Sequence, residues 1–227
     1  MSNNSPPYLD DGFVNRLEGR LGQLLRAQDA GELTLGGKLE IRRINAALAG
    51  RAAAPHAILM AGMPGAGKTT LARTLEEAGM ARLCPDEEMF RRYGHYGRDF
   101  PRGQFLVREA PVLKDIATDL QEHLAAGRDV VVDHGFWTPT ERNHWAAAAR
   151  EAGGTPLLVY LPVPHEVRWE RIRERNAKAL IDANSIEFSE EDLRRFAGRF
   201  HPPTAEENPV IYDGDPNAFL ALLRGRP

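Results

Sequence analysis

Cysteine is almost missing from this 227-residue sequence, in which Cys84 is the only one. A single cysteine excludes an intramolecular disulfide framework and a zinc site built from several cysteines. Long apolar runs are missing as well, since no stretch approaches the roughly 20 residues that a membrane span requires. The first residues contain neither a basic stretch nor an apolar core, so no signal peptide is expected. These absences predict a soluble, cytoplasmic protein without a membrane partner.

The chain also lacks a large excess of either charge sign, since its formal net charge is −3. This balance argues against broad electrostatic binding of nucleic acid, although it leaves room for a local basic site. Hydrophobic residues make up 42% of the chain, which is enough for a full core. The length of the chain suits one α/β domain with additional segments, or one domain with a small appended part.

The most informative stretch is Gly62-x-x-x-x-Gly67-Lys68-Thr69, which has the spacing of a phosphate-binding P-loop. Such a loop needs a strand before it, which residues 58–60 supply, and a helix after it, expected over 69–78. Glycines allow the backbone to approach a phosphate closely, and the helix N-terminus faces its charge. Lys68 can reach the outer phosphates, and the Thr69 hydroxyl can bind Mg²⁺. The predicted nucleotide-binding residues are Gly62, Met63, Pro64, Gly65, Ala66, Gly67, Lys68, Thr69 and Thr70.

Strands and helices are expected to alternate along the rest of the chain. Four more strands are predicted at 81–84, 129–133, 156–161 and 209–212, and further helices at 107–126, 138–152, 165–180, 189–200 and 216–223. This alternation predicts a parallel sheet with helices on both faces, in which ligands bind beyond the carboxyl ends of the strands.

An N-terminal extension precedes this pattern. Residues 1–9 are expected to be disordered, and two amphipathic helices are predicted from Asp10 and over 38–49. We therefore divide the chain into a helical extension, residues 1–54, and a phosphate-binding domain, residues 55–227. The extension is expected to pack on the domain or, alternatively, to regulate or dimerise it.

Two carboxylates follow predicted strands. Asp133 ends the run VVVD, the pattern of a Walker B acid, and would hold Mg²⁺ together with Thr69. Asp86 follows the second strand and could accept the proton of an attacking hydroxyl group. The alternatives are a solvated strand end for Asp133 and a helix-start residue for Asp86.

Four arginines, at 168, 171, 173 and 175, lie on the helix expected after the fourth strand. Arg171 and Arg175 are predicted to stabilise the charge of a transferring phosphoryl group. Arg168 and Arg173 are predicted to lie on a solvated face paired with glutamates.

An acceptor pocket is predicted in the glycine-rich, aromatic and basic segment 91–103, interpreted as an exposed loop, and just past Asp133. Its candidate residues are Arg92, Tyr93, His95, Tyr96, His134, Trp137 and Arg142. The histidine spacing matches no common set of metal ligands.

Taken in order, GMPGAGKTTLA, RLCPDE, DVVVDHGFWTPTER and YLPVPHEVRWERIRERN resemble P-loop kinase-like ATP-binding proteins related to zeta toxins and chloramphenicol phosphotransferase. The resemblance covers roughly residues 57–215. It implies a P-loop NTPase three-layer fold with a five-stranded sheet in the order 2-3-1-4-5, and ATP with Mg²⁺ on the loop. It also implies that Asp86 activates an acceptor hydroxyl and that Arg171 and Arg175 close over the phosphates. Cys84 departs from the Ser or Thr that is commoner before Pro-Asp.

These observations predict an ATP-dependent phosphotransferase acting on a hydroxyl group of a small molecule, such as an antibiotic, a nucleotide sugar or another metabolite. One alternative is a nucleotide-dependent switch or binding module without an acceptor. The other is a zeta-like toxin kinase or a kinase of polynucleotide 5′-hydroxyl groups. A GTPase is disfavoured because no Asn-Lys-x-Asp motif occurs.

Overall fold

The computed structural model describes residues 11–32, 40, 41, 44, 54–178, 183 and 186–225. The predictions for residues 1–9 and for most of the helix at 38–49 lie outside these ranges. The chain divides into two compact units, of which one comprises 1–53, 77–79 and 220–227 and the other 54–76 and 80–219. The predicted boundary after residue 54 stays a prediction.

The first unit contains the predicted N-terminal helix, α1, which spans Asp11–Asp29. Leu24 is buried, as expected for a residue on its apolar stripe. Arg20 on its polar side forms an ion pair with Glu40 at 2.7 Å. Residues 40, 41 and 44 are also helical.

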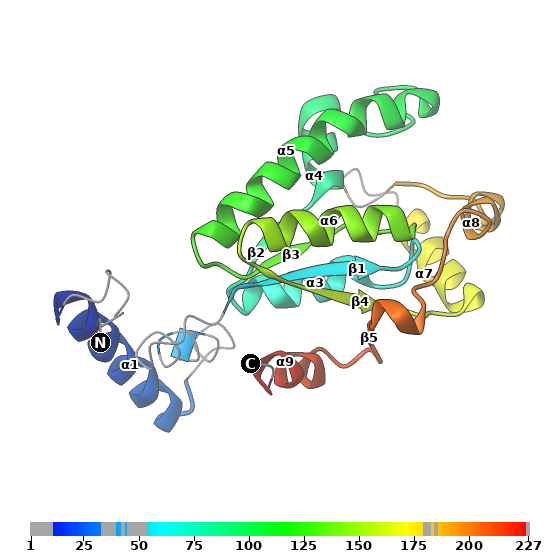
Figure 1. Cartoon of the computed structure of the whole chain (residues 1–227). Coiled ribbons are helices and arrows are strands. Elements are labelled where there is room, and N and C mark those ends of the chain that lie inside the picture. The colour runs from blue at the N-terminus through cyan, green and yellow to red at the C-terminus, as the bar shows by residue number, and fades with distance from the viewer. Residues whose placement is uncertain are drawn as a thin grey trace. The chain divides into compact units, whose positions relative to one another are not determined.

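The second unit is built on a five-stranded parallel sheet, as predicted (Figure 1). Its strands are β1 (His56–Ala61), β2 (Ala81–Leu83), β3 (Val130–Val132), β4 (Thr155–Tyr160) and β5 (Val210–Ile211). They lie in the order β2-β3-β1-β4-β5, which confirms the order implied by the resemblance. Every residue of β1 and β3 is buried, because helices cover both faces of the sheet.

Helices connect the strands. Their bounds are α3 (Lys68–Glu77), α4 (Pro85–Tyr93), α5 (Phe105–Ala125), α6 (Pro139–Glu151), α7 (His165–Ala177), α8 (Glu190–Ala197) and α9 (Pro216–Gly225), with 3₁₀ turns at Arg102–Gln104 and Ala205–Glu207. Helices α5 and α6 pack on one face of the sheet. Capping boxes fix the starts of two helices, Thr138 with Glu141 on α6 and Ser189 with Asp192 on α8.

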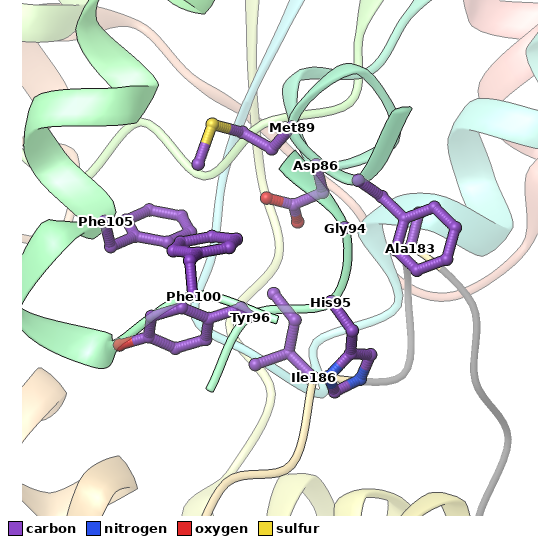
Figure 2. Close-up of a pocket in the computed structure, with 10 residues that line it drawn as sticks. Asp86, Met89, Gly94, His95, Tyr96, Phe100, Phe105, Ala183 and Ile186 are labelled. Atoms are coloured by element: carbon purple, nitrogen blue, oxygen red, sulfur yellow. The ribbon is translucent and has the colours of Figure 1, made fainter. Parts of the chain in front are cut away.

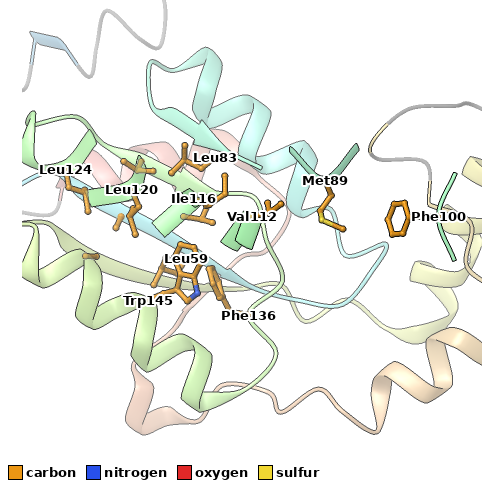
Figure 3. Packing of buried hydrophobic residues seen from close by; sticks show 14 residues of the cluster. Leu59, Leu83, Met89, Phe100, Val112, Ile116, Leu120, Leu124, Phe136 and Trp145 are labelled. Carbon is orange, nitrogen blue, oxygen red and sulfur yellow. The ribbon is translucent and has the colours of Figure 1, made fainter. Parts of the chain in front are cut away.

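One core cluster lies between the sheet and helices α5 and α6 (Figure 3). Alternate residues of β1 and β3 point into it, as the period of a strand requires. Helix α5 contributes residues at helical spacing, which bury one stripe along its length. The main contributors are Leu59, Val130, Val132, Val112, Ile116, Leu120, Leu124, Phe136 and Trp145.

The interpretation of residues 91–103 as an exposed loop is wrong in part. Residues 91–93 belong to helix α4, and Phe100 is buried at 4% exposure. The reason is aromatic clustering, because Phe100 packs against Tyr93 and Tyr96 with ring centroids 6.3 and 5.7 Å apart.

Among the described helices, none combines the length and the apolar character that crossing a membrane would take.

Candidate active site

The predicted P-loop joins β1 to α3, as its motif requires. Gly65 and Gly67 have φ values of +80° and +97°, which a side chain would make costly. A Cβ on Gly65 would also lie 2.7 Å from the backbone oxygen of Arg168. The loop therefore keeps a backbone cradle of the kind that binds phosphate. The predicted residues 62–70 all lie in this loop or in the first turn of α3, and their binding roles stay predictions.

Lys68 lies at the start of α3 and folds back over the loop. Its Nζ donates a hydrogen bond to the Met63 backbone oxygen at 3.2 Å. Burial lowers the pKa of Lys68, while the carboxylates of Asp133 and Asp86 oppose that change. Lys68 is thus close enough to both predicted acids for their charges to act on it.

Asp133 follows β3 directly, where its backbone N–H donates to the Leu83 oxygen of β2 at 2.8 Å. The Thr69 hydroxyl donates to Asp133 Oδ1 at 3.2 Å. The two predicted metal ligands are therefore brought together, and a hydroxyl and a carboxylate oxygen are the donor types that Mg²⁺ takes in proteins. These residues fit the expected ion.

Arg82 on β2 holds the other oxygen of Asp133, and sequence reasoning missed it. Its Nε and Nη2 donate to Asp133 Oδ2 at 3.1 and 2.7 Å, and its Nη1 and Nη2 donate to Glu87 at 3.1 and 2.8 Å. The Arg82 side chain is only 6% exposed. A strongly basic residue inside a short strand was the signal in the sequence. Arg82 links Asp133 to helix α4, which carries Asp86.

Asp86 is the second residue of α4, behind Pro85 at the helix start. Burial and the Asp133 carboxylate raise the pKa of Asp86 to about 6, against the opposing effect of Lys68 and Arg175. A carboxylate with a pKa near neutrality suits proton transfer. Cys84 before it makes no side-chain capping bond, in keeping with its departure from Ser or Thr.

A pocket opens beside Asp86 (Figure 2). The Asp86 carboxylate points toward the space between Tyr96, Phe100 and Ile186. The empty space between these side chains, including its open mouth, is about 250 Å³. The described lining consists of Asp86, Met89, Phe90, Gly94, His95, Tyr96, Phe100, Phe105, Ala183 and Ile186.

The positions of the α7 arginines differ from the prediction at Arg168. Arg171 Nη1 donates to the Gly65 oxygen of the P-loop at 3.2 Å, and Arg175 donates to the Ile186 oxygen at 2.5 Å. Arg173 pairs with Glu170 on an exposed face, as expected. Arg168 is not on a solvated face: it is 6% exposed, because its Nε bonds the Val163 oxygen and its backbone packs on Gly65.

Of the predicted acceptor residues, His95 and Tyr96 line the pocket. His134 lies near the donor side, where burial lowers its pKa to about 4 and the charges of Glu141 and Lys68 act on it. His134 therefore stays neutral at physiological pH.

The other predicted acceptor residues are absent from the described pocket lining. Arg92 forms ion pairs with Glu88 and with Asp115, the latter at 2.8 Å. Arg142 is 3% exposed and bonds Glu207 at 2.6 and 2.7 Å. The remaining two predicted acceptor residues pack against aromatic rings: Tyr93 contacts Phe100, and Trp137 contacts Phe196.

Sequence reasoning also missed the apolar wall of the pocket, formed by Met89, Phe105 and Ile186. A further omission is Glu109 on α5, where burial and the charges of Asp86 and Glu141 raise the pKa to about 8. A glutamate on the apolar stripe of a helix was the available signal.

Comparison with known proteins gives a consistent picture. The AAA domain family matches residues 58–203. A shikimate kinase from Aromatoleum aromaticum is 29% identical over 163 residues, which cover 69% of this chain and 84% of that protein.

Two solved structures share the fold. A putative kinase from Chloroflexus aurantiacus superposes with a TM-score of 0.62 at 22% identity, covering 75% of this chain and 97% of that one. Chaetomium thermophilum Kti12, solved in complex with ADP-AlF3, superposes with a TM-score of 0.51 at 14% identity, covering 74% and 97%. The fold is therefore that of the P-loop kinase-like proteins.

Proposed function

The chain belongs to the AAA domain family, and on that premise we propose that it is an ATP-dependent phosphotransferase. It moves the γ-phosphoryl group of ATP to a hydroxyl group of a small molecule. The observation that carries this proposal is the position of Asp86. Its charge interacts with that of Lys68 at the P-loop, and Asp86 also lines an aromatic pocket. A hydrolase or a switch has no need for a carboxylate shared between a phosphate cradle and a second pocket.

The donor side of the site binds the triphosphate. The P-loop backbone and Lys68 hold the phosphates, together with Arg171, which bonds the Gly65 oxygen, and Arg175, whose charge acts on Lys68. Thr69 and Asp133 would hold Mg²⁺, whose bound charge neutralises the phosphate oxygens. Arg82 fixes the orientation of Asp133 by occupying its second oxygen. Magnesium as the metal and a cytoplasmic location belong to the proposal.

On the acceptor side, Asp86 takes the proton of the attacking hydroxyl group. The hydroxyl oxygen bonds to the γ-phosphorus while the bond from that phosphorus to the leaving oxygen of ADP breaks. Lys68 and the α7 arginines stabilise the charge spread over the transferring group.

The test is Asp86→Asn, which keeps the size of the side chain and removes its basicity. We expect phosphoryl transfer to fall at least about 10²-fold, the usual lower contribution of a general base. ATP affinity, measured by calorimetry, should stay within a few-fold. An Asp119→Asn variant, exposed on α5, should keep full activity. Unchanged transfer by Asp86→Asn would refute the role of this carboxylate.

The rival function is a nucleotide-dependent switch or binding module without an acceptor. It predicts ATP turnover that never depends on an added acceptor, whereas a phosphotransferase forms a phosphorylated product that mass spectrometry detects. Two further possibilities share the phosphotransferase chemistry, a zeta-like toxin kinase and a polynucleotide 5′-hydroxyl kinase, whereas a chloramphenicol phosphotransferase-like enzyme would be one form of the proposed small-molecule kinase. Growth arrest on expression that a Lys68→Ala change abolishes would favour the toxin, and labelling of an oligonucleotide 5′-end would favour the polynucleotide kinase.

A further inference from the structure

Aromatic rings form much of the wall of the acceptor pocket. Tyr96 and Phe100 come from the segment before α5, and Phe105 is the first residue of that helix. The centroid of the Tyr96 ring lies 5.7 Å from that of Phe100 and 4.8 Å from that of Phe105. In Figure 2 the Asp86 carboxylate is turned toward these rings. The proposed base therefore faces an aromatic wall.

A tight turn holds this wall in shape. The His95 backbone N–H donates to Asp99 Oδ2 at 2.7 Å, and the Gly97 N–H donates to the Phe100 oxygen at 3.0 Å. The turn also pairs the backbones of Tyr96 and Phe100 in a β-bridge. These bonds fix the rings independently of a ligand, so binding requires little ordering of the wall.

The charges around Asp86 include cations as well as carboxylates. Lys68 and Arg175 both oppose the rise in the pKa of Asp86. Arg175 also donates to the backbone oxygen of Ile186, which lines the pocket, at 2.5 Å. Because a carboxylate and two cations lie within electrostatic reach of one another, charge alone favours neither a cationic nor an anionic acceptor. The shape and the polarity of the wall remain as the features that select the acceptor.

Polar side chains are few in the described part of this wall. Only Asp86, His95 and Tyr96 carry them among the described lining residues, and Asp86 is assigned to the reacting hydroxyl group. His95 Nδ1 is buried and has no hydrogen-bond partner among the described residues. Buried polar atoms are normally satisfied, so this nitrogen indicates where one polar atom of a ligand binds. A sugar would bring several more hydroxyl groups, and each one buried without a partner weakens binding.

From this arrangement we propose that the acceptor is a hydroxyl compound built on an aromatic ring, and not a sugar or another polyol. Its ring packs against Tyr96, Phe100 and Phe105, because aromatic pairs gain from edge-to-face and offset contacts beyond the area that they bury. Its reactive hydroxyl group faces Asp86, and one further polar atom bonds His95 Nδ1. The proposal rests on the proposed phosphotransferase function and names the substrate class of the same site.

The first experiment separates cellular metabolites by polarity. A small-molecule extract of cells is divided on a reversed-phase column, and each fraction is incubated with the whole protein and γ-labelled ATP. Labelled product is expected from a retained fraction that absorbs ultraviolet light, and mass spectrometry then identifies the ring. Transfer confined to sugars or to other acceptors without an aromatic ring overturns this inference and leaves the proposed function intact. Transfer in no fraction contradicts the proposed function and the inference with it.

The second experiment uses Phe105→Leu, which removes the ring and keeps an apolar side chain. The KM for the isolated acceptor should rise about 2- to 10-fold, the value of one aromatic pair, while the KM for ATP stays the same. Val107→Ala, at a position 77% exposed on the same helix, is the control and should behave as the wild type. Thermal unfolding verifies that the Phe105→Leu protein is folded. An unchanged acceptor KM would refute the contact with the ring.

The third experiment tests the buried nitrogen of His95. His95→Phe keeps a ring against Phe90, whose centroid lies 6.5 Å from that of His95, and removes Nδ1. The acceptor KM should rise about 2- to 10-fold, the value of one hydrogen bond, with little change in kcat. His95→Asn, which returns a polar atom close to the position of Nδ1, should restore the KM. Equal acceptor KM values for His95→Phe and the wild type would refute the hydrogen bond to Nδ1.

Discussion

Replacing Asp86 by asparagine should make the protein more stable as well as inactive. The side chain is partly buried, near another carboxylate, and its pKa rises from an ordinary 3.8 to about 6. The folded state therefore binds this proton more tightly than the unfolded state does. The contribution of protonated Asp86 to the free energy of unfolding is fully present below pH 3.8, and it is lost as the pH rises through 6.

The size of the effect follows from the same two values. Each pKa unit corresponds to about 1.4 kcal/mol, so the ionised Asp86 costs about 3 kcal/mol at pH 8. At pH 5 most folded molecules keep the proton, and the cost is roughly half as large. Asparagine carries no charge and avoids the cost at both values. For a chain of this length the gain at pH 8 corresponds to a melting temperature about 6–12 °C higher.

The assay is urea unfolding of the nucleotide-free protein, followed by tryptophan fluorescence at pH 5 and pH 8. The variant should gain stability at both values and gain more at pH 8. Asp119→Asn, in which an exposed carboxylate is neutralised, should gain little at either. A variant that is less stable than the wild type at pH 8 would show that Asp86 is a well-paired structural carboxylate, and the argument for a strained base would be wrong.

Three further predictions concern the same site. The transfer rate should fall about tenfold per pH unit below pH 6 and level off above it, because Asp86 must be ionised to accept a proton; a pH–rate profile checks this, and a flat acidic limb would contradict it. Arg82→Ala should cost about 3–5 kcal/mol in urea unfolding, because it leaves the buried Asp133 without its cation, and a variant as stable as the wild type would refute that pairing. Gly65→Ala should lower the melting temperature and the ATP affinity more than Gly127→Ala does, because both have positive φ but only Gly65 lies against backbone; equal losses would argue against this contact.

Much of the fold followed from local patterns in the sequence. The P-loop motif defines β1 and α3, and the unbroken valines at 130–132 indicate a strand buried on both faces. Because parallel strands end at the same edge, polar residues after β2 and β3 had to meet there, and Asp86 and Asp133 do come within electrostatic reach of each other.

The missed residues depend on pairings between distant segments. Arg82 reaches Asp133 because β2 pairs with β3 in a register that aligns Leu83 with Val132, and no local pattern specifies that register. Arg142 meets Glu207 from 65 residues away. Such contacts are decided by tertiary packing, so the sequence reasoning assigned Arg142 to the acceptor pocket.

The separation of the acceptor pocket from the P-loop in the sequence has a consequence for how this protein can evolve. The described lining comes from residues 86–105 and from 183 and 186, whereas the residues proposed to bind phosphate and metal are 62–70 and Asp133. Among the described lining residues, only Asp86 also has a proposed role in the phosphoryl-transfer step. Under the proposed function, mutations in the pocket wall can therefore change the acceptor while the residues proposed to bind ATP stay the same. Exchanging residues 94–105 between relatives should thus alter acceptor preference and leave ATP affinity unchanged, a division that lets one scaffold acquire new substrates by a few local substitutions.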